Sequence, residues 1–255
     1  MMSARCVAIV LGLASIAGAQ PAGPARMPVV VELFTSEGCS SCPPADALLS
    51  TLAWEQDVPG AEVIALGLHV TYWDDLGWKD PFSSRLATDR QQQYSRVFGE
   101  DRIYTPQIVV DGREEMVGSD AQAVRAAILR QTRGPHTRIA LWPHWDERGV
   151  TSRIVVPDLP AGIKEPLDLL LFVTEGHLRT QVKRGENASR LLKHDAVVRG
   201  MVKVATLDGK TRLPFEAEGF LAAGKDESAR PANPWQVVAI LQGRNSGRIW
   251  ASGIR

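Results

Sequence analysis

The stretch that decides the fold is PVVVELFTSEGCSSCPPAD, residues 28–46. Residues 28–34 are almost all apolar, which is typical of a strand covered on both faces. Two prolines at 43 and 44, followed by apolar residues three and four apart, predict a helix over 43–54. Cys39 and Cys42 therefore stand where a buried strand gives way to a helix. Two thiols at this spacing are the working unit of thiol–disulfide chemistry.

Strand and helix signals continue to alternate after this stretch. Residues 62–69 predict a second buried strand, and residues 83–98 predict a helix. Two strands at 107–110 and 114–117 flank the hairpin signal Asp111-Gly112, and a last helix capped by Ser119 or Asp120 reaches about 131. A strand–helix–strand unit requires parallel pairing with a right-handed crossover. We therefore expect an α/β domain over residues 27–134.

The pattern changes at Gly134-Pro135, after which helical periodicity fades. Short apolar or alternating runs separated by turn residues predict strands at 138–142, 151–156, 167–174, 197–206, 212–217, 236–242 and 248–252. About seven short strands separated by turn residues are typical of a β-sandwich. We expect an all-β sandwich-like domain over residues 136–255.

The charge balance narrows the range of partners. The chain has 255 residues, and its 29 Lys and Arg are matched by 29 Asp and Glu. Nucleic acids and anionic membrane surfaces select proteins with a basic excess. The composition therefore argues against both as partners.

The N-terminus has the features of a secretory signal. Arg5 precedes an apolar run at 6–16, and Ala17-Gly18-Ala19 supplies small residues for cleavage near Ala19. The run is shorter than the roughly 20 residues of a membrane span, so we expect no span in the mature chain. We predict a signal peptide over residues 1–19 and a periplasmic or secreted protein. Cys39 and Cys42 are then the only cysteines left, in a compartment where disulfides persist.

Three runs carry a resemblance to a known family: VELFTSEGCSSCPPAD (31–46), LHVTYWDDLGWKDPFSS (68–84) and YTPQIVVDG (104–112). They resemble the secreted thioredoxin-like proteins grouped as domain of unknown function 1223, over about residues 28–133. The resemblance implies an α/β thioredoxin-like first half followed by a β-rich second half. It implies no substrate, because a shared fold does not establish shared chemistry.

The predicted redox pair has distinct roles for its two thiols. Cys39 is expected just ahead of the helix, where unpaired N–H groups and the helix dipole stabilise a thiolate, so we assign it as the nucleophile. Cys42 is expected one turn in and less exposed, as the resolving thiol. A permanent structural disulfide and a metal-binding pair are the alternatives. A two-residue loop constrains the unfolded chain little and makes a poor structural link.

Three further residues complete the catalytic prediction. Glu32 is a lone carboxylate in an apolar strand, and two interpretations stay open: a proton acceptor for Cys42, which the resemblance implies, or a member of a local network. The resemblance also implies that Pro106 is cis and lies beside the disulfide. Thr105 before it would offer backbone hydrogen bonds to an extended substrate. The alternative for Pro106 is an ordinary trans proline that starts an edge strand.

The aromatic, acidic segment at 71–80 is the predicted substrate-recognition loop. Two interpretations stay open for this segment: a lid or wall over the thiols, or aromatic packing against the second half with solvated aspartates. We assign Tyr72 and Trp73 to the first and Trp78 to the second. His69 at the end of the second strand is more typical of a hydrogen-bonded structural histidine than of a ligand, and the other histidines have no metal-site spacing.

Together these features predict a thiol–disulfide oxidoreductase that acts on protein thiols or disulfides, with no bound cofactor and no metal. Ser40 and Ser41 do not indicate whether it oxidises, reduces or isomerises. The first alternative is a copper-handling protein with Cys39, Cys42 and His69 as ligands, since soft thiolates favour Cu(I). The second is a non-catalytic binding module.

Overall fold

The computed structural model describes residues 26–222 and 234–255. Its first half contains β1 (Met27–Thr35), α1 (Pro43–Trp54), β2 (Ala61–His69), α2 (Arg85–Phe98), β3 (Gln107–Val110), β4 (Glu114–Val117) and α3 (Ala121–Gln131). Its second half contains β5 (Thr137–Arg138), β6 (Ala140–Asp146), β7 (Gly149–Val156), β8 (Leu167–Glu175), β9 (Leu178–Gln181), β10 (Leu191–His194), β11 (Val197–Leu207), β12 (Phe215–Ala222), β13 (Trp235–Gly243) and β14 (Ile249–Ile254). No helix in the described part of the chain is long and apolar enough to span a membrane.

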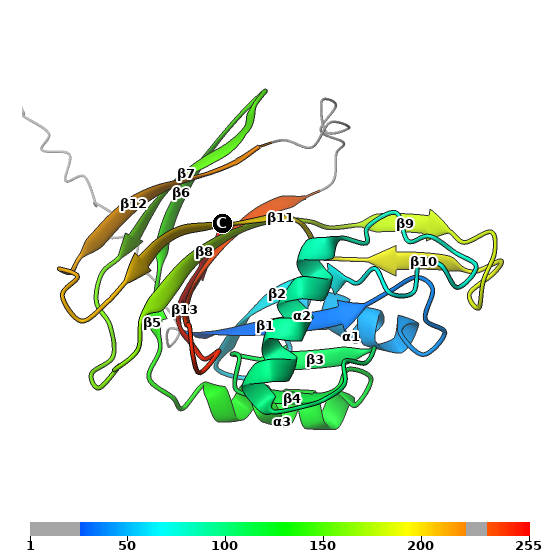
Figure 1. Cartoon of the computed structure of the whole chain (residues 1–255), viewed down its shortest axis with the longest axis horizontal. Helices are drawn as coiled ribbons and strands as arrows, with labels where there is room; N and C mark the ends of the chain where they lie inside the picture. The colour runs from blue at the N-terminus through cyan, green and yellow to red at the C-terminus, as the bar shows by residue number, and fades with distance from the viewer. Residues whose placement is uncertain (1–25, 223–233) are drawn as a thin grey trace, which may run out of the picture.

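Strands from both halves join in one nine-stranded mixed sheet, in the order β4-β3-β1-β2-β11-β8-β13-β14-β5 (Figure 1). β1 and β2 run parallel, as the predicted strand–helix–strand unit requires, and β3 and β4 form the predicted antiparallel hairpin at Asp111-Gly112. Two smaller sheets, β12-β7-β6 and β10-β9, complete the strand pairing.

The predicted fold class, an α/β thioredoxin-like domain followed by an all-β sandwich-like domain, is therefore wrong. Of the described residues, 43% lie in strands and 17% in helices, and the largest sheet crosses from one half to the other. The periodicity of a strand shows which of its faces are buried, but it does not show which strand pairs along its edge. The boundary between residues 134 and 136 stays a prediction.

The two halves meet where β2 lies beside β11. Gly67 is opposite Val197 in this parallel pair, and its N–H donates to the Ala196 carbonyl at 2.7 Å. A Cβ atom at position 67 would lie 3.2 Å from the Asp195 carbonyl oxygen and 3.4 Å from that of Ala196. Glycine therefore allows the second half to approach β2 closely enough to extend its sheet.

The sheet has a different cover on each face. Val29, Val31 and Leu33 of β1 point to one side and pack with residues of α1 and α3. Val30 and Phe34 point to the other side and pack with residues of α2, β8 and β13. Figure 1 shows α2 lying across the concave side of the curved sheet. Farther along, the small sheet β12-β7-β6 packs over the opposite face of β8 and β13.

A buried ion pair lies at the contact between β1 and α2. Arg90 donates to both carboxylate oxygens of Glu32, through Nε to Oε2 and through Nη2 to Oε1 at 2.9 Å. The Tyr94 hydroxyl also donates to Glu32, and Gln242 of β13 donates to that hydroxyl at 2.9 Å. Burial alone would lower the pKa of Arg90, but the Glu32 carboxylate raises it above its ordinary value. The network therefore joins β1 to α2 through a buried ion pair, and both to β13 through the Gln242 amide.

Replacing Arg90 with methionine should lower the free energy of unfolding by about 3–5 kcal/mol, because Glu32 would remain buried without its counter-ion. The matched control is Arg85→Met on the same helix, whose pair with Asp89 is exposed and should change stability by less than about 1 kcal/mol. Urea unfolding of both variants measures the difference. Equal losses in the two variants would contradict the structural role of the buried pair.

Candidate functional site

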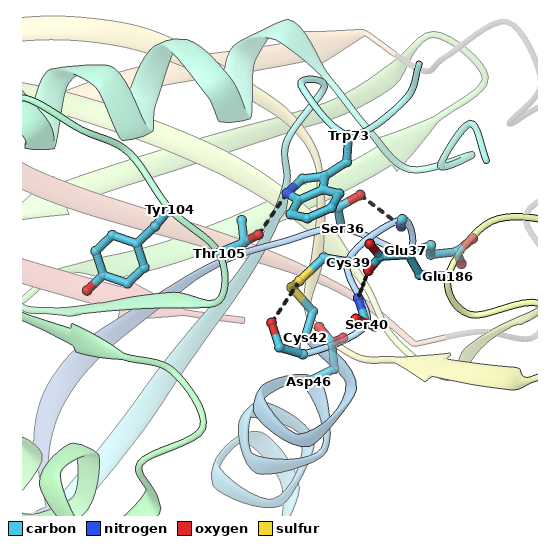
Figure 2. The surroundings of a disulfide bond; sticks show 12 residues. Ser36, Glu37, Cys39, Ser40, Cys42, Asp46, Trp73, Tyr104, Thr105 and Glu186 are labelled. Carbon is cyan, nitrogen blue, oxygen red and sulfur yellow. Dashed lines mark hydrogen bonds between the residues drawn. A yellow bond between two sulfur atoms is a disulfide. The ribbon is translucent and has the colours of Figure 1, made fainter. Parts of the chain in front are cut away.

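Cys39 and Cys42 form a disulfide directly ahead of α1 (Figure 2). Cys42 is the N-cap residue of the helix, and its carbonyl accepts from the N–H groups of Ala45 at 2.9 Å and Asp46 at 3.1 Å. The sequence predicts a more exposed Cys39, but both cysteines have 0% exposed area. Ser40 and Ser41, which lie between the two cysteines, are exposed to solvent. The disulfide is thus formed at the predicted junction but is covered.

The loop at 182–190, between β9 and β10, provides part of the cover. Asn187, itself fully buried, donates through Nδ2 to the carbonyls of Glu37 and Cys39, at 2.9 Å each. The N–H of Ser40 donates to Glu186 Oε2 at 3.0 Å (Figure 2). Sequence reasoning missed both side chains, because a polar run in a loop gives no signal of the distant segment that it contacts. Three hydrogen bonds between side chains of this loop and the backbone of the disulfide turn therefore connect the two segments.

Trp73 and Thr105 lie on another side of the disulfide (Figure 2). The Trp73 indole Nε1 donates to Thr105 Oγ1 at 2.8 Å. A Cβ atom at Gly38 would lie 3.1 Å from Trp73 Cβ, so the disulfide turn and this loop are in close contact. The Thr105–Pro106 peptide is cis, as predicted. The structure therefore brings Trp73 and Thr105 together beside Cys39 and Cys42.

Tyr72 takes a different position from Trp73. Its hydroxyl donates to Gln91 Oε1 on α2 at 3.2 Å, and its side chain is 37% exposed. Burial of the hydroxyl raises its pKa to about 12. Tyr72 is consequently a neutral hydroxyl at the surface of the predicted recognition loop.

A buried charged cluster adjoins the disulfide turn. Glu37 accepts from Trp78 Nε1 at 2.8 Å and lies 3.1 Å from His194 Nε2. His194 Nδ1 is 3.8 Å from an Asp46 carboxylate oxygen. Burial alone would lower the pKa of His194, but Asp46 and Glu37 raise it to about 10. His194 is therefore a cation at neutral pH, held between two carboxylates that flank the cysteines in sequence.

His69 belongs to the same region but is engaged by a carboxylate. Its Nδ1 lies 2.7 Å from Asp80 Oδ2, which also accepts from the Glu37 N–H at 2.8 Å. Burial would raise the pKa of Asp80, but the His69 imidazole and these hydrogen bonds lower it. Within residues 26–222 and 234–255, no three His, Cys, Asp or Glu side chains are grouped as metal ligands.

Glu32 makes its hydrogen bonds with Arg90 and Tyr94, on the α2 side of β1. Of the two interpretations of this carboxylate, these contacts correspond to the local network. The side chains that do surround the disulfide turn come from loops 71–80 and 182–190 and from β10 (Figure 2).

The charge on His194 should make stability depend on pH. Its folded-state pKa of about 10 lies above the ordinary 6.5, so its ion pairs stabilise the fold fully below about pH 6.5. That contribution falls as the pH rises and is lost above about pH 10. In urea unfolding between pH 6 and pH 10, His194→Gln should remove this part of the pH dependence, whereas the exposed control His144→Gln should keep it. An identical pH profile for His194→Gln and the wild type would contradict the assigned charge.

Comparison with known proteins places the chain in a family. No curated protein matches it. Two solved structures do: protein AGR_C_4864 from Agrobacterium tumefaciens (27% identity, TM-score 0.67, covering 91% of this chain and 95% of that one) and HBP35 of Porphyromonas gingivalis (14% identity, TM-score 0.65, covering 92% and 76%). The second likeness concerns the fold alone. The model of the family described as "Protein of unknown function (DUF1223)" matches residues 30–248, so the chain belongs to the DUF1223 family.

Proposed function

We propose that this protein is a thiol–disulfide oxidoreductase whose redox centre is the Cys39–Cys42 pair. The observation that carries the proposal is the position of the disulfide, directly ahead of α1 with Cys42 as its N-cap. Helix N-termini lower thiol pKa values, and redox cysteines occupy such positions. A bond between cysteines separated by three positions closes a very short loop and adds little entropic stabilisation to a fold of this size. Redox exchange accounts for the pair better than stabilisation does.

The helix N-terminus and a nearby hydroxyl favour an anionic sulfur in the reduced protein. The N-terminus of α1 contributes about 0.3–1 kcal/mol for a nearby negative charge, and up to about 2 kcal/mol when partly buried. The Ser41 hydroxyl lies 3.4 Å from Cys39 Sγ and can donate to a thiolate there. Glu37 and Asp46 oppose a negative charge on the sulfur, and cationic His194 reduces that opposition. These contributions support Cys39 as the nucleophile and Cys42 as the resolving thiol.

The exchange proceeds in two displacements. The Cys39 thiolate attacks one sulfur of a substrate disulfide, forms a mixed disulfide and releases one substrate thiolate, which takes up a proton from solvent. The Cys42 thiolate then attacks Cys39 Sγ, restores the Cys39–Cys42 disulfide and releases the second substrate thiolate. Two electrons pass to the substrate. The same steps in reverse oxidise a substrate dithiol.

Substrate access requires the cover to move. Neither cysteine has exposed area, so under this proposal the 182–190 loop moves away before a protein sulfur reaches Cys39. The 182–190 loop is fixed to the disulfide turn by the contacts of Asn187 and Glu186. Under this proposal Trp73 and Thr105 form the wall that stays beside the exposed sulfur and guides an extended substrate.

Export is part of the same proposal. Residues 1–19, which carry the predicted signal peptide, lie outside the described residues. Protein thiols and disulfides in an oxidising compartment are the proposed substrates, since a disulfide at this position would persist there.

The roles of the two cysteines can be tested by trapping. In Cys42→Ser the mixed disulfide has no resolving thiol, so incubation of this variant with insulin should accumulate a covalent adduct visible on non-reducing gels. Cys39→Ser is the matched control and should form no such adduct. Alkylation of the reduced wild type at pH 6 should label Cys39 before Cys42, as peptide mass spectrometry would show. Adducts through Cys39→Ser, or earlier labelling of Cys42, would reverse the assignment.

The cover can be tested through Asn187. Asn187→Ala removes two buried hydrogen bonds to the disulfide turn, each worth about 0.5–1.5 kcal/mol, so reduction of the disulfide by dithiothreitol should accelerate roughly tenfold. Asn245→Ala, on an exposed turn away from the disulfide, is the control and should leave the rate unchanged. Unchanged reduction of Asn187→Ala would show that this loop does not limit access.

A further inference from the structure

A second feature, independent of the cysteines, is a cavity of about 660 Å³ between α2 and the strands β8, β11 and β13. Its volume lies within the range of small-molecule sites. It opens where an element of the first half faces strands of the second, a common place for ligand sites. The proposed redox chemistry makes no use of it.

The rim of the cavity is cationic. Arg96, Lys203 and Arg244 line it together with one carboxylate, Asp168. Arg244 donates to Asp168 at 2.7 Å, and Lys203 Nζ is 3.9 Å from the same carboxylate oxygen. The guanidinium of Arg96 has neither a hydrogen bond nor an ion pair in the part of the chain that the structure describes. Three cations against one carboxylate leave an excess of positive charge at the entrance.

The floor of the cavity offers a buried donor. Arg90, whose side chain is 2% exposed, uses Nε and both Nη2 hydrogens for Glu32 and Tyr94, and one Nη1 hydrogen for Gln242 at 3.1 Å. Its other Nη1 hydrogen has no acceptor among the described residues. Arg90 is among the residues that line the cavity, so an acceptor that enters can approach its guanidinium.

The walls between rim and floor are partly apolar. Val97 of α2, Leu170 of β8 and Met201 of β11 line the same space. Burial of a hydrocarbon segment against such residues is favourable. The cavity therefore combines cationic groups, one of them the buried Arg90, with an apolar wall.

We propose that this cavity binds a small amphipathic carboxylate, with the carboxylate paired to the cationic groups and its hydrocarbon part against Val97, Leu170 and Met201. A neutral ligand of the same shape would not gain the ion pairs at the rim. A short hydrophilic anion would not gain the apolar contact. The lining residues thus favour a ligand that has both a negative charge and a hydrocarbon segment.

Isothermal titration calorimetry of the full chain with octanoate tests the proposal, with octan-1-ol and acetate as comparison probes. Octanoate should bind at least about tenfold more tightly than either. In Arg96→Gln/Lys203→Gln, octanoate affinity should fall about tenfold, since each partly exposed ion pair contributes up to about 1 kcal/mol. Lys210→Gln/Arg212→Gln removes the same charge on the exposed turn between β11 and β12 and should bind octanoate like the wild type.

Met201→Trp, which fills the cavity from β11, should abolish octanoate binding while circular dichroism shows the fold unchanged. Several outcomes would overturn the proposal: no octanoate binding, equal binding of octan-1-ol, an equal loss in the Lys210/Arg212 control, or unchanged binding in Met201→Trp. If Met201→Trp fails to fold, the paired charge variants still decide, because they change only exposed residues.

Discussion

The buried ion pair between Glu32 and Arg90 is the constraint on which the rest of the structure depends. Removing two charges from water costs several kcal/mol each, and the fold recovers this only because Tyr94 and Gln242 complete the hydrogen bonding. The need to keep these hydrogen bonds around Glu32 and Arg90 fixes the rotation of α2 about its axis and its distance from β1. It also fixes β13 relative to both. The position of β1 in turn places the disulfide turn that follows it.

The same network links two features that lie on different sides of the molecule. Residues beyond β1 form the covered disulfide, whereas Arg90 and Gln242 face the cavity under α2. The cover of the disulfide and the lining of the cavity each include residues from both halves of the chain. The disulfide turn contacts Asn187 at a sequence separation of 150, and the cavity combines α2 with β8, β11 and β13. The N-terminal half alone would therefore lack this cover and most of the cavity wall.

Local features of the fold were predictable from the sequence. The apolar run of β1, the prolines at the start of α1 and the Asp111-Gly112 turn act over a few residues, and the structure has these elements as predicted. The strands β9 and β10 were missed, because four-residue segments with polar neighbours carry a weak alternation signal. The arrangement of the halves was also missed, since the edge pairing of β2 depends on backbone groups that every residue has.

Within the site, the predictable part was again local. The spacing of Cys39 and Cys42 and the Thr105-Pro106 pair identified their region directly. His194 could not be identified in this way, because the sequence does not show that Glu37 and Asp46 lie beside it in the fold. Glu32 shows the opposite case: a carboxylate in an apolar strand signals a buried partner, but the partner Arg90 is known only from the packing of α2.

The junction of β2 with β11 has a consequence for how the chain reaches its native state. During synthesis, β1 and β2 emerge long before Val197, so the β2 edge opposite β1 has no partner until most of the chain exists. Closing so long a loop is entropically costly and makes folding slow, as in other topologies of high contact order. Meanwhile an unpaired apolar edge can pair with another chain. The junction thus makes early folding intermediates prone to aggregation, and a chain that ends before Val197 would keep that open edge.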